Sequence, residues 1–430
     1  MCPSAAQTRS DISATSIATG RRDDLMKQGS SHAIDQRRGK TSKRLPTLGI
    51  SLAALVGTMV IGQVQGAGAS EGDSSRATAG QGAAFAMSNV TAGNRIVRYR
   101  RSADGSLTRV GSIATRGLGQ GTDLDTTGGL LLSDDHRYLY AANAGSDDIS
   151  VFSVRGTRLR FLQRVPAGDQ PNSLTEHGDL LYALNGSVAG NGIRGFRVSG
   201  DGKLRPIAGS VRLLSSPIAV PGQVQFSPDG RTLLVTQKTT NESLSPERAI
   251  DAFRVEGDGR PSATPNRDAS HGIRPFSLAF RRDGKLVVAE SFDATPNMSA
   301  VSSYRLASSG ALSTISGSVR NRQTDTCWIV VTRDGRYVFT ANFGSGTISS
   351  YAYDASGRVR LINGRAAILG DASQPVDLAL SNDSRYLYLL LRGTGGVAAF
   401  GVHPDGSLRP LGTAVGGLPV SDGASGLAVY

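Results

Sequence analysis

The stretch SPDGRTLLVTQ, residues 227–237, has the form of a tight turn that leads into a strand. Ser, Pro, Asp and Gly favour turns, and the apolar residues that follow are typical of a buried strand. Variants of this stretch recur along the chain. They are SDDHRYLYAAN (133–143), TEHGDLLYALN (175–185), RRDGKLVVAES (281–291), TRDGRYVFTAN (332–342) and SNDSRYLYLLL (381–391).

The spacing of these copies indicates a repeat protein. Their third residues fall at positions 135, 177, 229, 283, 334 and 383, so the intervals lie between 42 and 54 residues. That period fits the blade of a β-propeller and is too long for leucine-rich or hexapeptide repeats. Six units also have a second turn with a common signature, Asp-Gly at 104–105, 201–202, 258–259 and 405–406 and Ser-Gly at 309–310 and 356–357. Only the unit centred on position 135 departs, with Arg155-Gly156-Thr157. The two turns and the strands around them predict four strands per unit.

A seventh unit spans residues 84–112 and lacks an innermost strand. The segment GLAVY at 426–430 resembles the inner strand VDLAL at 376–380, so it can supply the missing strand. We therefore predict an all-β fold, a seven-bladed β-propeller with four-stranded antiparallel blades over residues 83–430. The C-terminal strand should join the N-terminal blade and close the ring, which leaves only short sheet edges.

The first 69 residues resemble an export signal. Residues 1–47 carry nine Lys or Arg and four Asp, residues 48–64 are uncharged and largely apolar, and Ala67-Gly68-Ala69 forms an A-x-A site. This order is typical of a signal peptide, and residues 70–82 read as a linker. We predict export to the periplasm or beyond the cell. The alternative is that residues 48–64 stay uncleaved and anchor the chain in a membrane.

Charge and cysteine content exclude several classes of protein. The formal net charge is +12, but without residues 1–69 the chain keeps 38 basic and 31 acidic side chains, scattered over turns and strands. No basic stripe interleaves with aromatic residues, so we predict no nucleic-acid partner. Two cysteines are too few for a disulfide scaffold or a Cys-rich metal site, and no calcium-loop spacing occurs, so we predict no metal and no cofactor.

The period near fifty, the SPDGR turn and the Asp-Gly-x-Leu hairpins resemble the lactonase-type seven-bladed propellers. That family includes phosphogluconolactonases and carboxymuconate-cyclising enzymes, and the resemblance covers residues 83–430. It implies a seven-bladed propeller and a cofactor-free reaction on a lactone or an unsaturated dicarboxylate. In the enzymes the inner strand often opens with Pro followed by His. This chain differs, with Pro171-Asn172, Pro221-Gly222, Pro275-Phe276 and Pro375-Val376.

In a four-stranded antiparallel blade, the first and third turns lie at one end of the ring, and the second turn and the link to the next blade lie at the other end. The stereotyped Asp-Gly turns share one face, and the longer, variable loops at 116–127, 238–247 and 291–299 share the other, here called the variable rim. Variable loops on a rigid frame are where binding residues are usually found. We therefore expect any functional site on the variable rim, around the mouth of the channel.

Of the histidines in residues 83–430, only His271 falls on the variable rim. It precedes Arg274 at the entry to an inner strand, and Glu290 ends the neighbouring strand at the same rim. Lactone hydrolysis needs a base to deprotonate water and a donor for the developing oxyanion. We predict His271, Glu290 and Arg274 as catalytic residues. The predicted substrate-binding residues are Lys238, Arg322, Asp325 and Trp328.

Two functions remain open from the sequence. The first is an exported lactonase-like hydrolase or cyclase that acts on a small cyclic ester. The second is a non-catalytic binding propeller of the YVTN-repeat kind, which would recognise a surface polymer or a protein; the missing Pro-His pairs favour it. The expected partner is accordingly a small molecule or a surface ligand, and the chain is expected to be a monomer.

Overall fold

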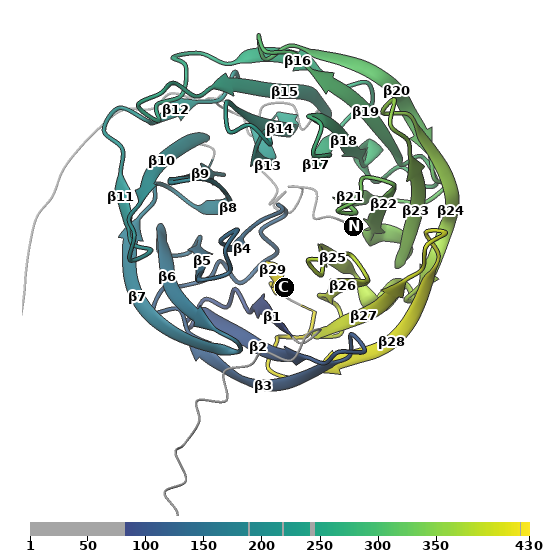
Figure 1. Ribbon diagram of the computed structural model, residues 1–430, viewed down its shortest axis with the longest axis horizontal. Helices are drawn as coiled ribbons and strands as arrows, with labels where there is room; N and C mark the ends of the chain where they lie inside the picture. Colours follow the sequence, from purple (N-terminus) through teal and green to yellow (C-terminus); the bar gives the residue numbers. More distant parts are fainter. Residues whose placement is uncertain (1–81, 188–189, 217–218, 241–245, 422) are drawn as a thin grey trace, which may run out of the picture. The chain divides into compact units, whose positions relative to one another are not determined.

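A computed structural model describes residues 82–187, 190–216, 219–240, 246–421 and 423–430. Seven antiparallel sheets surround a common axis (Figure 1), which confirms the predicted seven-bladed β-propeller. The predicted signal peptide and most of the predicted linker lie outside the described residues. Within the described part of the chain, no helix has the length and apolar character needed to span a membrane.

The blades are numbered 1 to 7 along the chain. In blades 2 to 7 the strands follow chain order from the axis outward, whereas in blade 1 the last strand of the chain is the innermost (Figure 1). Blade 1 contains β29 (Leu427–Val429), β1 (Gly82–Met87), β2 (Arg95–Arg101) and β3 (Leu107–Ala114). Blade 2 contains β4 (Leu130–Leu132), β5 (Tyr138–Asn143), β6 (Asp148–Arg155) and β7 (Arg158–Pro166). Blade 3 contains β8 (Pro171–His177), β9 (Leu180–Asn185), β10 (Gly192–Val198), β11 (Leu204–Pro206) and β12 (Arg212–Leu213).

The remaining blades have four strands each. Blade 4 contains β13 (Ala219–Phe226), β14 (Thr232–Thr240), β15 (Pro246–Arg254) and β16 (Asn266–Ala269). Blade 5 contains β17 (Pro275–Phe280), β18 (Lys285–Glu290), β19 (Ala300–Leu306) and β20 (Leu312–Arg320). Blade 6 contains β21 (Thr326–Val331), β22 (Tyr337–Asn342), β23 (Thr347–Tyr353) and β24 (Val359–Ile368). Blade 7 contains β25 (Pro375–Leu380), β26 (Tyr386–Leu391), β27 (Gly396–Val402) and β28 (Leu408–Val415).

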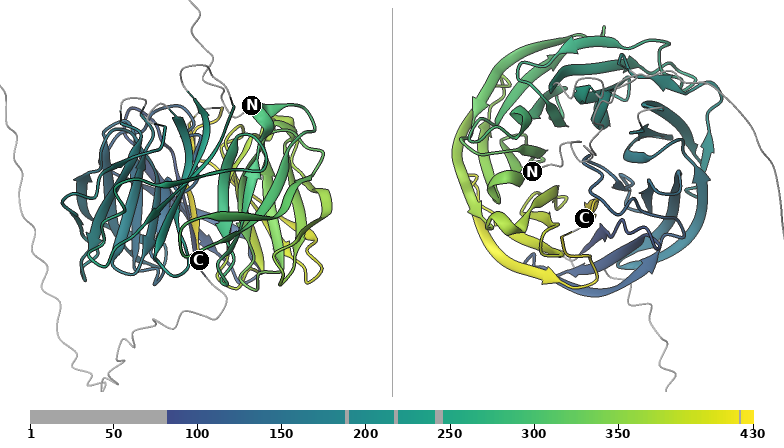
Figure 2. Two further views of the ribbon diagram at one scale, coloured as in Figure 1. Left: turned by 90° about the horizontal axis from the view of Figure 1, so that it is seen from above. Right: turned by 180° about the vertical axis from the view of Figure 1, so that it is seen from behind.

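Blade 3 differs from the predicted four strands because its outer edge is divided. The short strands β11 and β12 both pair with β10, at its two ends. Three short 3-10 turns, η1 (Phe292–Ala294), η2 (Phe343–Ser345) and η3 (Asp371–Ser373), lie in the connections of blades 5, 6 and 7. Seen from the side, the strands run between two ends of the ring, where the turns and loops gather (Figure 2).

The ring is closed by the last strand of the chain, as predicted. β29 pairs antiparallel with β1, with Ala84, Phe85 and Ala86 opposite Val429, Ala428 and Leu427. Two further backbone bonds extend the pairing, because Met87 N–H donates to Gly426 O and Tyr430 N–H donates to Ala83 O, each at 3.0 Å. Blade 1 is therefore shared by the two ends of the described chain.

Neighbouring blades are locked by a tyrosine that packs on a glycine. The Tyr138 hydroxyl donates to Gly200 O at the outer turn of blade 3, and the Tyr386 hydroxyl donates to Ala103 O at the outer turn of blade 1. A Cβ added to Gly202 or Gly105 would lie 2.2 Å from these tyrosine rings. Both glycines also have positive φ. The Asp-Gly-x-Leu signature thus encodes contact between blades as well as a turn.

The stereotyped turns share a hydrogen-bonded frame. In blade 2 the Ser133 hydroxyl donates to Asp135 Oδ1 at 2.8 Å and accepts from Tyr138 N–H at 2.9 Å, while Arg137 N–H donates to the same carboxylate oxygen. The same frame recurs around Asp229, Asp334 and Asp383. These side chains form hydrogen bonds with backbone groups of the turn. Their recurrence from blade to blade therefore serves the fold.

Truncation of Leu427 tests the closure. Leu427 is 7% exposed and packs in a hydrophobic cluster formed mainly by blades 1, 6 and 7. Leu427→Ala should cost about 2–5 kcal/mol, because it removes apolar contacts and leaves a cavity. We expect Tm to fall by several degrees in a calorimetric scan. Val415→Ala on the outer strand, where the side chain is 63% exposed, should leave Tm nearly unchanged; an equal fall in both variants would contradict the role of β29.

Candidate functional site

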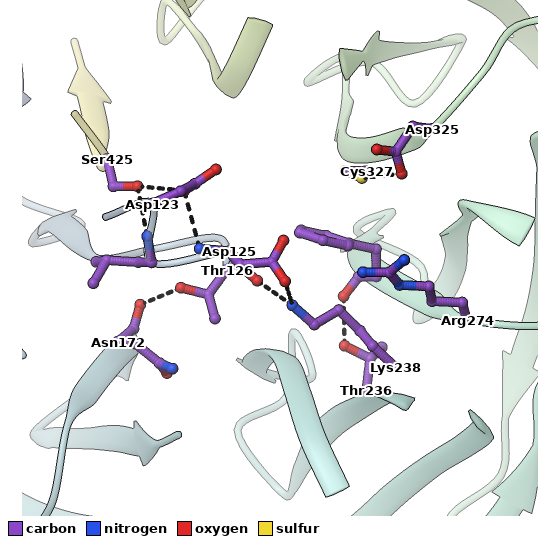
Figure 3. A network of polar contacts seen from close by, with 12 residues as sticks. Asp123, Asp125, Thr126, Asn172, Thr236, Lys238, Arg274, Asp325, Cys327 and Ser425 are labelled. Carbon is purple, nitrogen blue, oxygen red and sulfur yellow. Dashed lines mark hydrogen bonds and ion pairs between the residues drawn. The ribbon is translucent and has the colours of Figure 1, made fainter. Parts of the chain in front are cut away.

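The link from β3 to β4 crosses the axis of the ring on the variable rim. Residues 122–127 of this link, here called the axial segment, contact residues of blades 3, 4, 6 and 7. Figure 3 shows the contacts with Asn172 of blade 3 and Lys238 of blade 4. A segment that touches the inner strands of blades on opposite sides must lie at the axis. The contacts are Asp123 with Arg392, Asp125 with Lys238, and Thr126 with Asn172 and Trp328.

Lys238 forms a buried ion pair with the axial segment. It lies on β14 and is fully buried. Its Nζ donates to Asp125 Oδ2 at 2.5 Å and to the backbone oxygen of Asp125, and it lies 4.4 Å from the centre of the Phe276 ring. Burial lowers the pKa of Lys238, the carboxylate of Asp125 opposes that shift, and the positive charge of Arg274 adds to it. A buried cation is thus neutralised by a carboxylate of the axial segment.

Trp328 holds the axial segment in place. Its indole Nε1–H donates to Thr126 O at 3.1 Å, and its ring packs on Phe276 with centroids 4.9 Å apart. On the opposite side, the Thr126 hydroxyl donates to Asn172 O at 2.6 Å. Because Trp328 is 1% exposed, its ring serves the packing around the axis in this structure.

The other carboxylate of the segment faces blade 7. Asp123 Oδ2 pairs with Arg392 Nη1 at 3.1 Å, and its Oδ1 accepts hydrogen bonds from the Ser425 hydroxyl at 2.8 Å and from Asp125 N–H at 3.0 Å. Burial raises the pKa of Asp123, the neighbouring charge of Asp125 raises it further, and Arg392 opposes both. Asp123 therefore ties the segment to blade 7 and to the residues just before β29.

Asp377 adds a further buried carboxyl group to the same region. It is 3% exposed and its Oδ2 accepts a hydrogen bond from Gly426 N–H at 2.6 Å. Burial raises its pKa to about 7, and the charge of Asp123 contributes to the increase. Asp377 is therefore partly protonated near neutral pH. It interrupts an otherwise apolar inner strand and has positive φ at a break in the strand register.

Arg274 and Asp325 also face this region (Figure 3). Arg274 is 3% exposed, has positive φ, and donates from Nη1 to Asp293 Oδ1 at 2.9 Å. Asp325 is fully buried and has positive φ just before β21. Of the seven predicted site residues, the structure therefore gathers Arg274, Lys238, Asp325 and Trp328 around the axis.

His271 and Glu290 form a separate chain between blades 4 and 5. The Ser318 hydroxyl donates to Glu290 Oε2 at 2.7 Å, so it accepts from His271 Nδ1, 2.9 Å away. Ser318 lies on β20, the outermost strand of blade 5, and has positive φ. The structure thus brings His271 and Glu290 together through a serine, whereas the side chain of Arg274 turns away toward Asp293 and Lys238.

Glu290 is enclosed by donors. Besides Ser318, the carboxylate accepts from Gly272 N–H at 2.7 Å and from the Ser302 and Ser270 hydroxyls at 2.5 and 3.4 Å. The side chain is fully buried, so a substrate cannot reach it without local opening. His271 is exposed and is the accessible end of this chain of hydrogen bonds.

Arg322 lies outside both groups. It is exposed, has positive φ, and lines a pocket over the outer strands of blades 5 and 6.

Sequence reasoning missed the contribution of Asp123, Asp125, Asp377 and Arg392 to the axial site. Asp123 and Asp125 lie in the long link at 116–127, and within the described residues no group of three or more His, Cys, Asp or Glu is arranged to hold a metal ion. In the sequence, Asp123 and Asp125 are recognisable as an acidic pair in a long link between blades. The signal for Asp377 was a carboxylate within the apolar strand PVDLAL.

Comparison with known families agrees with this architecture. The family model described as "Lactonase, 7-bladed beta-propeller" matches residues 88–220 and 290–364. No curated protein matches the chain significantly.

Several solved structures share the fold. A protein from Lactobacillus plantarum has a TM-score of 0.64 at 17% identity, over 81% of this chain and 99% of its own. A putative 6-phosphogluconolactonase from Bacteroides fragilis has a TM-score of 0.63 at 18% identity, over 82% and 99%. The periplasmic gluconolactonase of Pseudomonas aeruginosa has a TM-score of 0.59 at 18% identity, over 81% and 99%. The predicted resemblance is confirmed: this seven-bladed propeller is similar to the lactonase family.

The pair formed by Asp125 and Lys238 provides a test of the axial segment. Asp125→Ala leaves a fully buried ammonium without its carboxylate, which should destabilise the fold by about 3–5 kcal/mol. The double variant Asp125→Ala/Lys238→Met removes both charges and should recover part of that loss. Thermal unfolding of both variants measures the difference. If the double variant is less stable than Asp125→Ala, the pair is not coupled as the structure indicates.

Asp377 predicts a pH-dependent stability. Its pKa is raised to about 7 in the folded state, so the folded protein binds more protons than the unfolded chain between about pH 4 and 7. Its contribution to stability is therefore present at pH 4 and is lost as pH rises through 7. Asp377→Asn should raise Tm relative to the unmodified protein at pH 8 and leave it nearly equal at pH 4. A gain of the same size at both pH values would contradict this assignment.

Proposed function

We propose that this propeller is a lactonase-like enzyme that hydrolyses, or in reverse forms, a small cyclic ester bearing a carboxylate. The site would be the axial cluster formed by Lys238, Arg274 and Asp125 on the variable rim. A muconate-type lactone is one substrate of this class.

The observation that carries this proposal is the state of the buried polar atoms around the axis. Arg274 Nε and Asp125 Oδ1 are buried and have no hydrogen-bond partner. Buried polar groups are nearly always paired, so an unpaired donor and an unpaired acceptor in one region suit a ligand that supplies both. Lys238 places an ammonium group beside the same carboxylate.

The chemistry follows from these groups. Asp125 would accept a proton from water as the water oxygen attacks the lactone carbonyl, and the negative charge would develop on the carbonyl oxygen. Lys238 and the Arg274 guanidinium would stabilise that oxyanion, where fixed cations in a dry site are most effective. The bond from carbonyl carbon to ring oxygen then breaks, and the ring oxygen takes up the proton. The product is a hydroxy acid.

One observation favours the alternative, a non-catalytic binding propeller. The axial residues lie beneath the axial segment, with Lys238, Arg274 and Asp325 at most 3% exposed. A substrate would need the segment to move, whereas a surface ligand would not. Export would suit either function and remains a proposal from residues 1–69.

Steady-state hydrolysis of glucono-δ-lactone, muconolactone and γ-butyrolactone tests the proposal. Lys238→Met and Arg274→Gln each remove one oxyanion donor, so each should lower kcat/KM about 100-fold or more. His271→Ala tests the separate chain between blades 4 and 5. His403→Gln, in a stereotyped turn on the opposite face, is the matched control, and Tm confirms that each variant is folded.

The outcomes separate the hypotheses. Loss of activity in the two axial variants, with His271→Ala and His403→Gln active, supports the axial site. Loss only in His271→Ala would move the site to the chain that includes Ser318 and Glu290. Background rates for the unmodified protein on muconolactone, the one probe that carries a carboxylate, would eliminate the proposed hydrolase and leave the binding propeller.

A further inference from the structure

A second pocket, independent of the axial site, lies on the variable rim between the outer strands of blades 5 and 6. It has a volume of about 830 Å³. Its walls come from the end of β20, the link to β21, η2 and β24. It is lined by three arginines, Arg320, Arg322 and Arg365, and by the amide side chains Asn297, Asn321, Gln323 and Asn363. Both charge and amide groups are therefore concentrated in one place.

The floor of the pocket is a rigid polar network. Asn321 is 1% exposed and its Nδ2 donates to Thr326 Oγ1 at 2.8 Å and to Asn342 Oδ1 at 3.0 Å. Its Oδ1 accepts from Gln323 N–H, and Gln323 Oε1 in turn accepts from the Thr347 hydroxyl at 3.0 Å. The link that carries Arg322 is fixed by these bonds. The pocket is thus preformed, which limits the entropy lost on binding.

β24 approaches this floor closely at a glycine. A Cβ on Gly364 would lie 2.5 Å from Asn321 O. The register of β24 against β23 breaks at this point, between the pairs Ile348–Ala367 and Ser350–Asn363. The bulge brings Arg365 to the edge of the pocket, a common use of such irregularities.

Within the described part of the chain, no Asp or Glu lies within ion-pair distance of Arg320, Arg322 or Arg365, although Asp371 also lines the pocket. The arrangement contrasts with the stereotyped turns, where arginines such as Arg137 and Arg385 pair with the aspartate of their own turn. The pocket therefore carries excess positive charge.

Arg320 also has a buried donor atom without a hydrogen-bond partner. Its guanidinium lies 3.8 Å from the centre of the Phe292 ring, which fixes its plane. Its Nη1 is buried and has no hydrogen-bond partner. A buried, unpaired guanidinium donor is costly unless a ligand accepts from it. Arg320 is thus held in position, and its Nη1 donor is available to a ligand.

We propose that this pocket binds an acidic saccharide. Arginine forks recognise carboxylate, sulfate or phosphate groups through paired hydrogen bonds. The amide side chains of Asn297 and Asn363, which lie outside the floor network, carry both donors and acceptors, which suit sugar hydroxyls. The volume exceeds what a single inorganic anion needs and falls within the range of small-molecule sites. This binding does not depend on the proposed reaction at the axis.

Calorimetric titration with defined oligosaccharides tests the proposal. The probes are a galacturonate tetrasaccharide, a sulfated chondroitin tetrasaccharide and neutral maltotetraose. We expect at least one acidic probe to bind about tenfold or more tightly than maltotetraose, a difference of about 1.4 kcal/mol. Its binding should weaken as salt is added, and the two acidic probes distinguish carboxylate from sulfate recognition.

Matched variants locate the site. Arg322→Gln/Arg365→Gln removes two exposed guanidinium groups of the pocket and should weaken binding of the acidic probe about tenfold or more. Arg360→Gln, also exposed on β24 but outside the pocket, should bind like the unmodified protein, and Tm should be unchanged in both. Failure of both acidic probes to exceed maltotetraose, or full binding by the double variant, would overturn the proposal whatever the lactone assays give.

Discussion

The pairing of β29 with β1 is the constraint on which the rest of the structure depends. It makes blade 1 out of both ends of the described chain, and so fixes seven sheets around one axis. Only in a closed ring can Lys238, Trp328 and Arg392, which come from three different blades, reach the same six-residue axial segment. Asp123 connects the two features directly, because it accepts a hydrogen bond from Ser425, just before β29. The geometry of the axial site therefore depends on closure of the ring.

Much of the fold could be predicted from the sequence because the determinants are local and repeated. The turn around Asp229 and the glycine at position 202 each have a fixed structural task, and the same task recurs in other blades. A period that recurs over six copies of one stretch is hard to misinterpret. The divided edge of blade 3 could not be predicted, since it arises from two short strands that share β10, and no repeat encodes it.

The site was less predictable because it is made of contacts between distant residues. The order of turns correctly placed Arg274 and His271 on the same rim, yet their side chains leave the backbone in different directions, and the positive φ of Arg274 contributes to this. No sequence pattern states that Asp125 and Lys238, 113 residues apart, form a pair. The long link that carries Asp125 was recognisable as variable, but its course across the axis depends on side chains from four blades.

The axial site and the arginine-lined pocket between blades 5 and 6, here called the rim pocket, stabilise positive charge in different ways. Their degree of burial explains the difference. Lys238 is fully removed from water, and an isolated buried ammonium would be very costly, so the chain supplies Asp125 as its partner. Arg322 and Arg365 keep contact with solvent, which stabilises their charge without a carboxylate. An anion entering the rim pocket therefore displaces only water, whereas an anion entering the axial site competes with Asp125. For this reason the rim pocket can bind without rearrangement, while any reaction at the axis must involve Asp125, either as the base or as the group that gives way.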